Sequence, residues 1–279
     1  MITGRTRTFA LLGHPVAHSR SPELHNVWFA EHNVDARYVA LDVDPARADQ
    51  VVAALRTLPL AGVNLTIPFK EAVVPALDAV EGFAAQVGAV NTVVREGDRL
   101  IGHNTDGLGF LAGLRAEFGD RVTGARVLVL GAGGAGLGVG AACASAGARS
   151  VTWLNRDVTR AQAACDRTTT HWPGVAVDAG ALDAAAFAAR AAEVDLVIAA
   201  TSGGAADTLA SFDVDLLRPD AVWCDLNYWM SAPPSLARLR ARGVAVQSGM
   251  PMLVYQAAEA FRLFTGLTVD AAGALRRMV

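Results

Sequence analysis

Lysine is almost absent from this chain of 279 residues. Of its 24 basic residues, Lys70 is the only lysine and the other 23 are arginines. Arginine serves wherever a permanent positive charge is enough, because a guanidinium does not release its proton in a protein, whereas a lysine amine can be tuned to do so. Lys70 is therefore a candidate for proton transfer. The alternative is a solvated charge on a helix surface, and its neighbours must decide between the two.

Cysteines are also few, and neither positive nor negative charge predominates. The three cysteines, Cys143, Cys165 and Cys224, are far apart and form no CxxC pair, which indicates small core residues in a reducing cytoplasm instead of a disulfide framework or zinc site. Net charge is −3 with both signs interspersed, so no basic stripe favours nucleic acid. The apolar run FALLG is too short for a signal peptide. We expect a cytoplasmic protein without nucleic-acid or membrane partners, either a monomer or a homodimer.

Two patterns suggest a membrane span or a metal site, and the residues argue against both. Residues 127–148 carry no charge over 22 positions, but seven of them are glycine. Their bulky residues gather in VLVL, which favours a buried strand, a tight turn and an Ala/Gly helix over a span. Prolines interrupt any helix that would align the early histidines, and no carboxylate lies at ligand spacing, so we expect no metal. These histidines are His14, His18, His25 and His32.

Short apolar runs alternate with amphipathic segments through most of the chain, which is typical of an α/β fold with parallel strands and crossover helices. In the first hundred residues we expect strands at 9–13, 38–43 and 63–66. Helices should begin at Pro22 and Pro45, each after a candidate N-cap, Ser21 and Asp44. The run VVREGDRLIG predicts a hairpin that turns at Gly97 and the following aspartate.

A second series of elements begins at residue 126. It predicts strands at 126–130, 150–154, 175–177, 195–200 and 221–228, with helices between them, and is typical of a Rossmann-type doubly wound unit. A long helix over 250–264 and a last helix after Asp270 should return to the first domain. We therefore expect a substrate-binding and catalytic domain over 1–106, completed by 250–279, and a nucleotide-binding domain over 107–249. Closure of the two domains would hinge near Asp106 and Gly249.

The run GAGGAG at 131–136 follows four apolar strand residues and opens a helix, the context in which GxGxxG predicts dinucleotide binding. Backbone N–H groups there can approach a pyrophosphate, although the glycines could serve strand–helix packing alone. After the next strand, where an NAD site would place Asp or Glu, stand Asn155, Arg156 and Arg160. Two guanidiniums suit a 2′-phosphate, unless they form only an exposed helix face. Because Asp157 would repel that phosphate if it pointed inward, NADP is favoured and NAD stays possible.

Lys70 lies in GVNLTIPFKEA, where a strand that ends in Asn64 and Thr66 runs into a helix start. The carboxyl ends of parallel strands are where α/β proteins bind ligands. Asp106, in GHNTDG, stands just before the helix that leads into the nucleotide domain. A lysine and an aspartate that meet there would form a proton-transfer pair. The alternative for Asp106 is a helix N-cap.

Several motifs occur in a fixed order along the chain: GHPVAHSRSPELHN, GVNLTIPFK, GAVNTV, GHNTDG, GAGGAG, LNRDVTR, ATSGG, DLNY and GMPMLVYQ. Together they resemble the shikimate dehydrogenase family over nearly the full length. The resemblance implies reversible NADPH-dependent reduction of the 3-keto group of 3-dehydroshikimate to shikimate. In it, Lys70 would be the general acid/base and Asp106 its partner and a substrate anchor.

The resemblance also implies binding roles for other residues. Those for the substrate are Ser19, Ser21, Asn64, Thr66, Asn91, Tyr228 and Gln256. Those for the cofactor are Gly131, Ala132, Gly133, Gly134, Ala135, Asn155, Arg156, Arg160, Thr201, Leu226 and Gly249. Ser19 and Ser21 could instead only cap the helix at Pro22.

Two places depart from the family pattern. Pro251 stands where the family usually has a second glycine, and residues 229–234 are bulkier and more apolar than usual. Both leave the ring acid open among shikimate, quinate and an amino-substituted analogue, although the pair Ser19 and Ser21 favours shikimate. The alternatives are a quinate/shikimate or aminoshikimate-type dehydrogenase that uses NAD or NADP and, in another class, a non-catalytic nucleotide-binding sensor.

Overall fold

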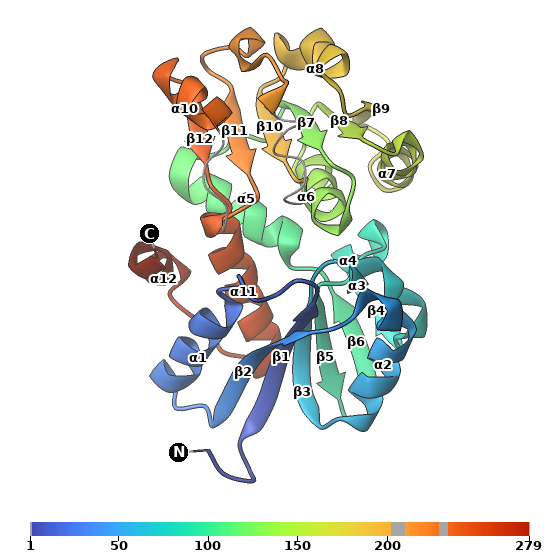
Figure 1. Cartoon of the computed structure of the whole chain (residues 1–279), viewed down its shortest axis with the longest axis vertical. Helices are drawn as coiled ribbons and strands as arrows, with labels where there is room; N and C mark the ends of the chain where they lie inside the picture. The colour runs from blue at the N-terminus through green and yellow to red at the C-terminus, as the bar shows by residue number, and fades with distance from the viewer. Residues whose placement is uncertain (1, 202–209, 229–233, 279) are drawn as a thin grey trace. The chain divides into compact units, whose positions relative to one another are not determined.

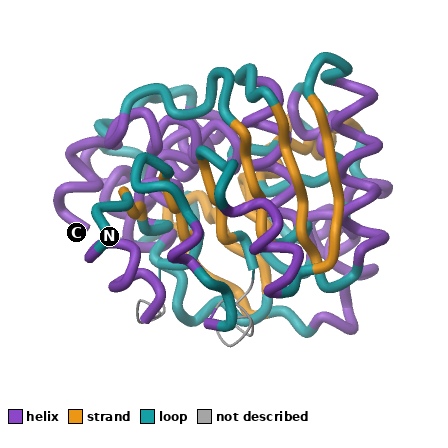
Figure 2. Tube along the Cα trace, turned by 90° about the horizontal axis from the view of Figure 1, so that it is seen from above, coloured by secondary structure: helices purple, strands orange, loops and turns teal. Residues whose placement is uncertain are grey.

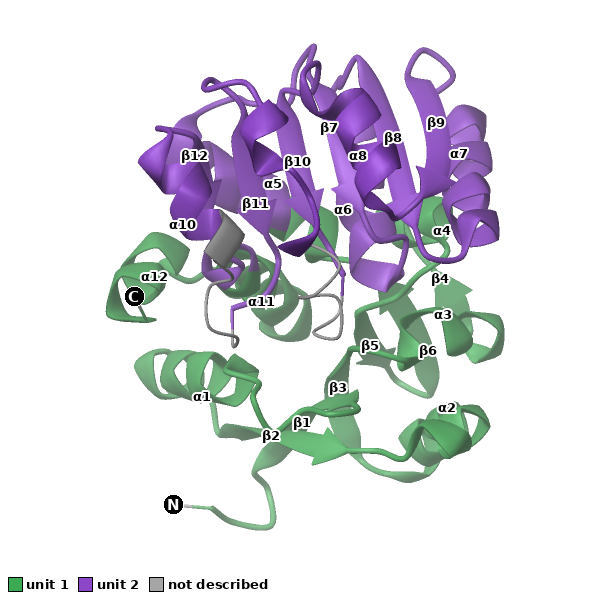
Figure 3. Ribbon diagram, turned by 45° about the horizontal axis from the view of Figure 1, so that its top comes forward, with its two compact units in different colours: residues 1–109, 253–279 green, residues 110–252 purple. Residues whose placement is uncertain are grey.

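The chain folds into two compact units, drawn in different colours in Figure 3. The computed structural model describes residues 2–201, 210–228 and 234–278. One unit comprises Met1–Gly109 and Leu253–Val279, and the other comprises Phe110–Met252. The chain passes from one to the other inside helix α5 (Asp106–Phe118) and returns inside helix α11 (Met250–Thr265). The assignment of these units to substrate and nucleotide remains a prediction.

The first unit is built on a mixed six-stranded sheet (Figure 1). Strand β1 pairs in parallel with β2 and β3, and β5 pairs antiparallel with β3 and β6. The predicted hairpin is confirmed, because β5 and β6 are joined at Gly97 and Asp98. In spatial order the strands are β2 (Ala36–Asp42), β1 (Arg7–Gly13), β3 (Leu60–Leu65), β5 (Thr92–Glu96), β6 (Arg99–His103) and β4 (Ala79–Val80).

Helices pack on both faces of this sheet, because successive side chains of a strand point to opposite faces. On β1, Phe9 contacts Phe29 and Phe264, whereas Ala10 and Leu12 belong to a cluster with the side chains of α2. The helical elements of the unit besides α11 are α1 (Ser21–Glu31), η1 (Pro45–Arg47), α2 (Ala48–Thr57), α3 (Phe69–Ala72), η2 (Val74–Ala76), α4 (Phe83–Val87) and α12 (Ala271–Met278).

One of the two predicted helix caps is confirmed and one is wrong. The Asp44 side chain accepts a hydrogen bond from the Ala46 N–H at 2.9 Å. Ser21, in contrast, is the first residue of α1, and Arg20 occupies the N-cap position without a side-chain cap bond. The Ser21 N–H instead donates to Ser19 Oγ at 3.3 Å. Helix α1 therefore begins one residue earlier than the predicted start at Pro22.

The second unit has a six-stranded sheet in which every strand pair is parallel. Taken along the chain, its strands lie in the order 6-5-4-1-2-3, which is the doubly wound dinucleotide-binding arrangement. The predicted series lacked the sixth strand, β12, and helix α10 (Pro234–Ala241) before it. In spatial order the strands are β12 (Ala245–Gln247), β11 (Val222–Asp225), β10 (Leu196–Ala199), β7 (Arg126–Leu130), β8 (Ser150–Asn155) and β9 (Ala176–Ala181).

Helices alternate with these strands along the chain, and Figure 2 shows helices beside the strands of the molecule. One face of the sheet carries an apolar cluster that includes Leu128, Phe187 and Trp223. The uncharged stretch 127–148 is confirmed as a buried strand, a turn and a helix. No helix in the described part of the chain has the length and apolar character that a membrane crossing requires. The further helices are α6 (Gly134–Ser145), α7 (Val158–His171), α8 (Ala184–Ala191) and η4 (Val214–Leu216).

Candidate active site

Lys70 and Asp106 form an ion pair within the first unit. Lys70, on α3, donates from Nζ to Asp106 Oδ2 at 2.6 Å, and their side chains are only 12% and 5% exposed. Lys70 is therefore not a solvated surface charge, and Asp106 is the first residue of α5 instead of its N-cap. Charges this far from water persist only when their remaining hydrogen-bonding capacity is also met.

Asn91 meets the remaining capacity of the aspartate. Its Nδ2 donates to Asp106 Oδ1 at 2.8 Å and to Thr105 Oγ1 at 2.9 Å. The orientation of the amide is set by its other end, because Asn91 Oδ1 accepts from the Thr105 N–H at 2.8 Å. The segment before Asn91 is tied to the lysine helix, since the Val90 N–H donates to the Lys70 carbonyl at 2.7 Å.

Two more predicted substrate residues join this network. Asn64 Nδ2 donates to the Asn91 carbonyl at 3.1 Å, and the Thr105 hydroxyl donates to Gln256 Oε1 at 3.4 Å. Gln256 reaches this position because α5 has glycine at residue 109, where a Cβ would lie 2.6 Å from Gln256 Cα. Residues as distant in sequence as Asn64 and Gln256 are thus joined to one hydrogen-bond network around the ion pair.

Three other predicted substrate residues are not hydrogen-bonded to this network in the described part of the chain. Ser19 and Ser21 follow strand β1 and Thr66 follows β3, so all three come from the carboxyl edge of one sheet, as Lys70 does. Thr66 packs against Gly13, where an added Cβ would overlap its methyl group. Among the described residues, no hydrogen bond joins these three side chains to the ion pair. Tyr228 is half-buried and lies in the second unit.

The glycine turn of the second unit has the geometry of a phosphate cradle. Gly131 has φ +111°, and a Cβ on Gly136 would overlap the Gly131 carbonyl, so both glycines serve the turn and its packing on α6. A Cβ on Gly133 would meet nothing within 4 Å, and the start of α6 has no side-chain cap. The helix start therefore has room beside Gly133 and no side-chain cap on its N–H groups, which fits a pyrophosphate at a helix N-terminus. Gly134 and Ala135 are the first two residues of this helix.

The end of strand β8 is tied to the same turn. Asn155 Oδ1 accepts from the Ala132 N–H at 3.1 Å, and Asn155 Nδ2 donates to the Asp157 carbonyl at 2.9 Å. Arg156 and Arg160 are both exposed. The Asp157 carboxylate caps α7 by accepting from the Thr159 N–H, and bonds from the side chain and backbone of Thr159 lower its pKa. The Asp157 carboxylate is therefore engaged in capping α7.

Asn227 connects two predicted cofactor residues, Thr201 and Gly249, and Gly249 packs on a third, Leu226. Asn227 Nδ2 donates to the Thr201 carbonyl at 3.3 Å and to Asp225 Oδ1 at 2.9 Å. Burial raises the pKa of the Asp225 carboxyl. The Gly249 N–H donates to the Asn227 carbonyl at 3.3 Å, and a Cβ on Gly249 would overlap the Leu226 carbonyl.

Comparison with known sequences decides the family. The model described as "Shikimate dehydrogenase substrate binding domain" matches residues 11–93, "Shikimate / quinate 5-dehydrogenase" matches 114–209, and "Shikimate 5'-dehydrogenase C-terminal domain" matches 249–278. A shikimate dehydrogenase (NADP(+)) of Rhodospirillum rubrum is 40% identical, over 100% of this chain and 99% of its own. The chain belongs to the shikimate dehydrogenase family.

Solved structures of shikimate dehydrogenases and of a quinate dehydrogenase have the same fold as this chain. Shikimate 5-dehydrogenase from Thermus thermophilus, in complex with NADP(H) and shikimate, is 37% identical with a TM-score of 0.82, over 98% of this chain and 100% of that one. Quinate dehydrogenase from Corynebacterium glutamicum, in complex with NAD, is 32% identical with a TM-score of 0.84, over 98% of both chains. The α/β prediction, with an N-terminal domain and a Rossmann-type domain, is confirmed.

One of the two departures from the family pattern has a structural explanation. Pro251 lies in the first turn of α11, where the missing N–H costs nothing. It packs on Gly113, where an added Cβ would lie 2.9 Å from Pro251 Cβ. Residues 229–233 of the other departure lie outside the described residues.

Sequence reasoning about this shikimate dehydrogenase family member missed several network residues. Thr105 and Thr92 stand inside the quoted motifs GHNTDG and GAVNTV, so those motifs carried the signal. Tyr38 had no signal, although its hydroxyl donates to Asn64 Oδ1 at 2.7 Å. The connection exists only because strands β2 and β3 lie on either side of β1.

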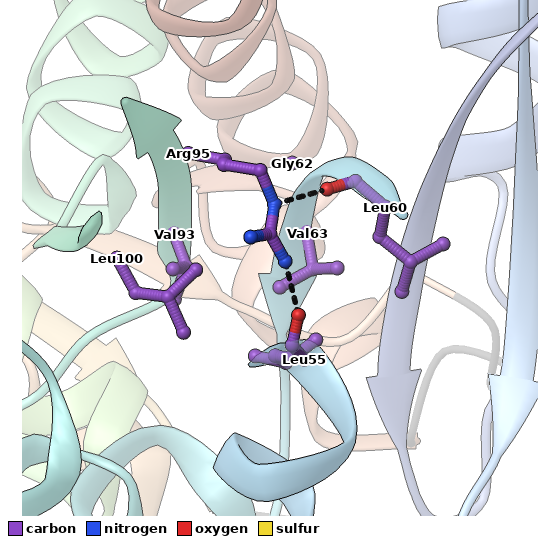
Figure 4. A pocket seen from close by; sticks show the side chains of 7 residues that line it. All are labelled: Leu55, Leu60, Gly62, Val63, Val93, Arg95 and Leu100. Atoms are coloured by element: carbon purple, nitrogen blue, oxygen red, sulfur yellow. Dashed lines mark hydrogen bonds between the residues drawn. The ribbon is translucent and has the colours of Figure 1, made fainter. Parts of the chain in front are cut away.

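A small pocket in the first unit lies at the wrong end of the sheet for this chemistry (Figure 4). Arg95 donates there to the carbonyls of Leu55 and Leu60, near the end of α2 and the start of β3, whereas Lys70 follows the other end of β3. In the described ranges, no group of three or more His, Cys, Asp or Glu side chains could hold a metal ion. The pocket is lined by Leu55, Leu60, Gly62, Val63, Val93, Arg95 and Leu100.

Proposed function

We propose that this protein is an NADP-dependent shikimate dehydrogenase, which reversibly reduces 3-dehydroshikimate to shikimate. The observation that carries the proposal is the buried pair of Lys70 and Asp106, held by Asn91, in a member of this family. Such an enzyme supplies precursors of the aromatic amino acids in the cytoplasm. A cytoplasmic location agrees with Cys143, Cys165 and Cys224, which are all free and buried.

Lys70 carries out the proton transfer. As hydride reaches the carbonyl carbon, the oxygen becomes an alkoxide, and the Lys70 ammonium group supplies both the stabilising charge and the proton. In the oxidative direction the neutral amine removes the proton from the substrate hydroxyl. The side chain is 12% exposed, so water can restore or remove the proton between turnovers. Asp106 holds the amine and offers its carboxylate to a substrate hydroxyl.

Polar side chains would bind the ring acid. A small polyhydroxy acid needs neutral donors and acceptors, because each unpaired hydroxyl in a dry pocket costs affinity. Asn91 contacts the ion pair and Gln256 contacts Thr105 beside it; both would bind ring hydroxyls together with Thr66, Asn64 and Tyr228. Ser19 and Ser21 would bind the carboxylate.

The second unit would bind the nucleotide. NADPH supplies the hydride when bound. The N–H groups at Gly133, Gly134 and Ala135 would hold its pyrophosphate, and Thr201, Leu226 and Gly249 would contact the nicotinamide. Arg156 and Arg160 would pair with the 2′-phosphate. The capping role of Asp157 supports NADP, because its carboxylate is engaged with α7.

A steady-state comparison of shikimate and quinate, each with NADP and with NAD, tests this function. We expect the highest kcat/KM for shikimate with NADP. Comparable rates with quinate and NAD would replace the proposal by a quinate/shikimate dehydrogenase. Cofactor binding without turnover of any ring acid would favour a nucleotide-binding sensor.

A further inference from the structure

A chain of buried hydrogen bonds leads from the aromatic core of the first unit to the proton-transfer pair. It begins at Tyr38, a residue of strand β2 that is only 2% exposed. The Tyr38 hydroxyl donates to Asn64 Oδ1 at 2.7 Å. No step of the proposed reaction uses Tyr38, so this contact needs its own explanation.

The first link has a defined direction. Asn64 Nδ2 lies 3.1 Å from the Asn91 carbonyl oxygen, which can only accept, so the NH₂ group must face it. Its second hydrogen goes to Thr92 Oγ1 at 2.9 Å. The Tyr38 hydroxyl holds the opposite end of the same amide. Both ends of Asn64 are therefore engaged, and turning the amide over would place its oxygen against the Asn91 carbonyl oxygen, which can only accept.

The second link, through Thr92, orients the Asn91 amide toward the aspartate. Thr92 has a single hydroxyl hydrogen, and because Thr92 accepts from Asn64 it is free to donate that hydrogen to Asn91 Oδ1 at 2.9 Å. The oxygen of the Asn91 amide is thus surrounded by donors. Its Nδ2 is left to face Asp106 Oδ1, at 2.8 Å, while Asp106 Oδ2 accepts from Lys70.

The start of the chain is held rigidly in the core. The Asn26 side chain accepts from the Tyr38 N–H at 2.9 Å and donates to the Tyr38 carbonyl at 2.8 Å. The His25 ring stacks on the Tyr38 ring with centroids 4.3 Å apart and an interplanar angle of 3°. The tyrosine hydroxyl therefore has a fixed place from which to orient the amide.

We propose that Tyr38 is a positioning residue for proton transfer, acting through Asn64 and Thr92 on Asn91 and so on the aspartate of the pair. The inference rests on the proposed function, because it assumes that Lys70 and Asp106 transfer the proton. Asn64 then serves as a link in the chain as well as a substrate residue: both its amide hydrogens are used inside the protein, so a ring hydroxyl would donate to the second lone pair of Oδ1.

The decisive variants remove one hydroxyl each and keep the shape of the side chain. Tyr38→Phe retains the ring that stacks on His25, and Thr92→Val replaces a hydroxyl by a methyl group. Each should lower the single-turnover rate of hydride transfer by about five- to ten-fold, as expected for the loss of one buried hydrogen bond. KM for NADP should stay within about two-fold of wild type, since no cofactor-binding residue changes.

The double variant tells whether the two hydroxyls lower the rate through one shared chain or independently of each other. If both hydroxyls act through the same chain, the rate of Tyr38→Phe with Thr92→Val should be close to that of the slower single variant. Independent effects would multiply instead. Thr168→Val is the matched control, because it also removes a buried hydroxyl, one that donates to the Ala164 carbonyl on α7. It should leave the transfer rate unchanged.

A spectroscopic readout does not depend on the substrate. Because Lys70 is the only lysine, ¹⁵N-lysine labelling gives a single side-chain ammonium signal. We expect a ¹H–¹⁵N cross-peak for the held ammonium in wild type and in Thr168→Val, and a shifted or broadened one in Tyr38→Phe.

The two readouts tell the failure of this inference from that of the proposed function. A wild type that turns over no ring acid would end the proposed function, while the cross-peak would still report on the hydrogen-bond chain. A Tyr38→Phe protein with wild-type cross-peak and wild-type transfer rate would refute the positioning role, even if the protein were less stable.

Discussion

The histidine in the aromatic core should make this protein sensitive to acid. His25 is 0% exposed and is surrounded by rings, including Tyr38 and Trp28. In the described part of the chain, neither of its ring nitrogens has a hydrogen-bond partner. Burial lowers the pKa of His25 from 6.5 to about 3, because a charged ring would have no water or counter-charge.

The sign and size of the effect follow from proton linkage. Below pH 6.5 the unfolded chain binds a proton at this histidine and the folded chain does not, until about pH 3. The contribution of the neutral His25 to the free energy of unfolding is therefore fully present above pH 6.5 and decreases as the pH falls. The loss reaches about 2 kcal/mol near pH 5 and about 4 kcal/mol near pH 3, at about 1.4 kcal/mol per pKa unit.

His25→Phe tests this reasoning, because it keeps an aromatic ring and removes the titration. Urea unfolding of wild type and variant should be compared at about pH 7.5 and about pH 5, so that the carboxylates common to both proteins cancel. The variant should gain about 2 kcal/mol relative to wild type on going to the lower pH. His171→Gln, which alters an exposed histidine, should show no such gain. Equal pH dependence of wild type and His25→Phe would refute the argument.

Three further predictions concern catalysis and binding. Lys70→Arg should lower kcat by about 10³-fold, because the guanidinium keeps its proton. NADPH binding, followed by fluorescence, should be retained. Gly109→Ala should raise KM for shikimate and cost about 1–3 kcal/mol in urea unfolding, because its Cβ would push against Gln256. Replacing both Arg156 and Arg160 by Gln should raise KM for NADP by at least about ten-fold and leave KM for NAD nearly unchanged.

Two of these three predictions have a matched control variant, and each has an outcome that would contradict it. For the glycine, Ala116→Ser enlarges the side chain at an exposed position of the same helix and should leave KM unaltered. For the arginines, Arg149→Gln removes an exposed charge at the opposite end of strand β8 and should leave KM for NADP unaltered. An active Lys70→Arg enzyme, a Gly109→Ala enzyme with normal KM, or equal losses with both nucleotides would each contradict the corresponding prediction.

The sequence predicted the features that depend on neighbours along the chain. The hairpin at Gly97 follows from turn chemistry between two alternating runs, and the strand–turn–helix at Gly131 follows from an apolar run that meets glycines. The proximity of Lys70 and Asp106 was also predictable, because Lys70 follows the carboxyl end of a strand and Asp106 precedes the helix into the second unit. Local propensity was less reliable at helix ends, where Ser21 proved to be inside its helix.

Tertiary structure alone decided how the side chains of the site connect. Tyr38, Asn64, Asn91 and Asp106 come from separate elements, so no local pattern could show that their amides and hydroxyls form one chain. The direction in which Asp157 points was also undecided until α7 supplied the N–H group that its carboxylate accepts. A sequence determines which donors and acceptors are available, but hydrogen bonds act over about 3 Å, and only the packed sheet brings distant residues within that range.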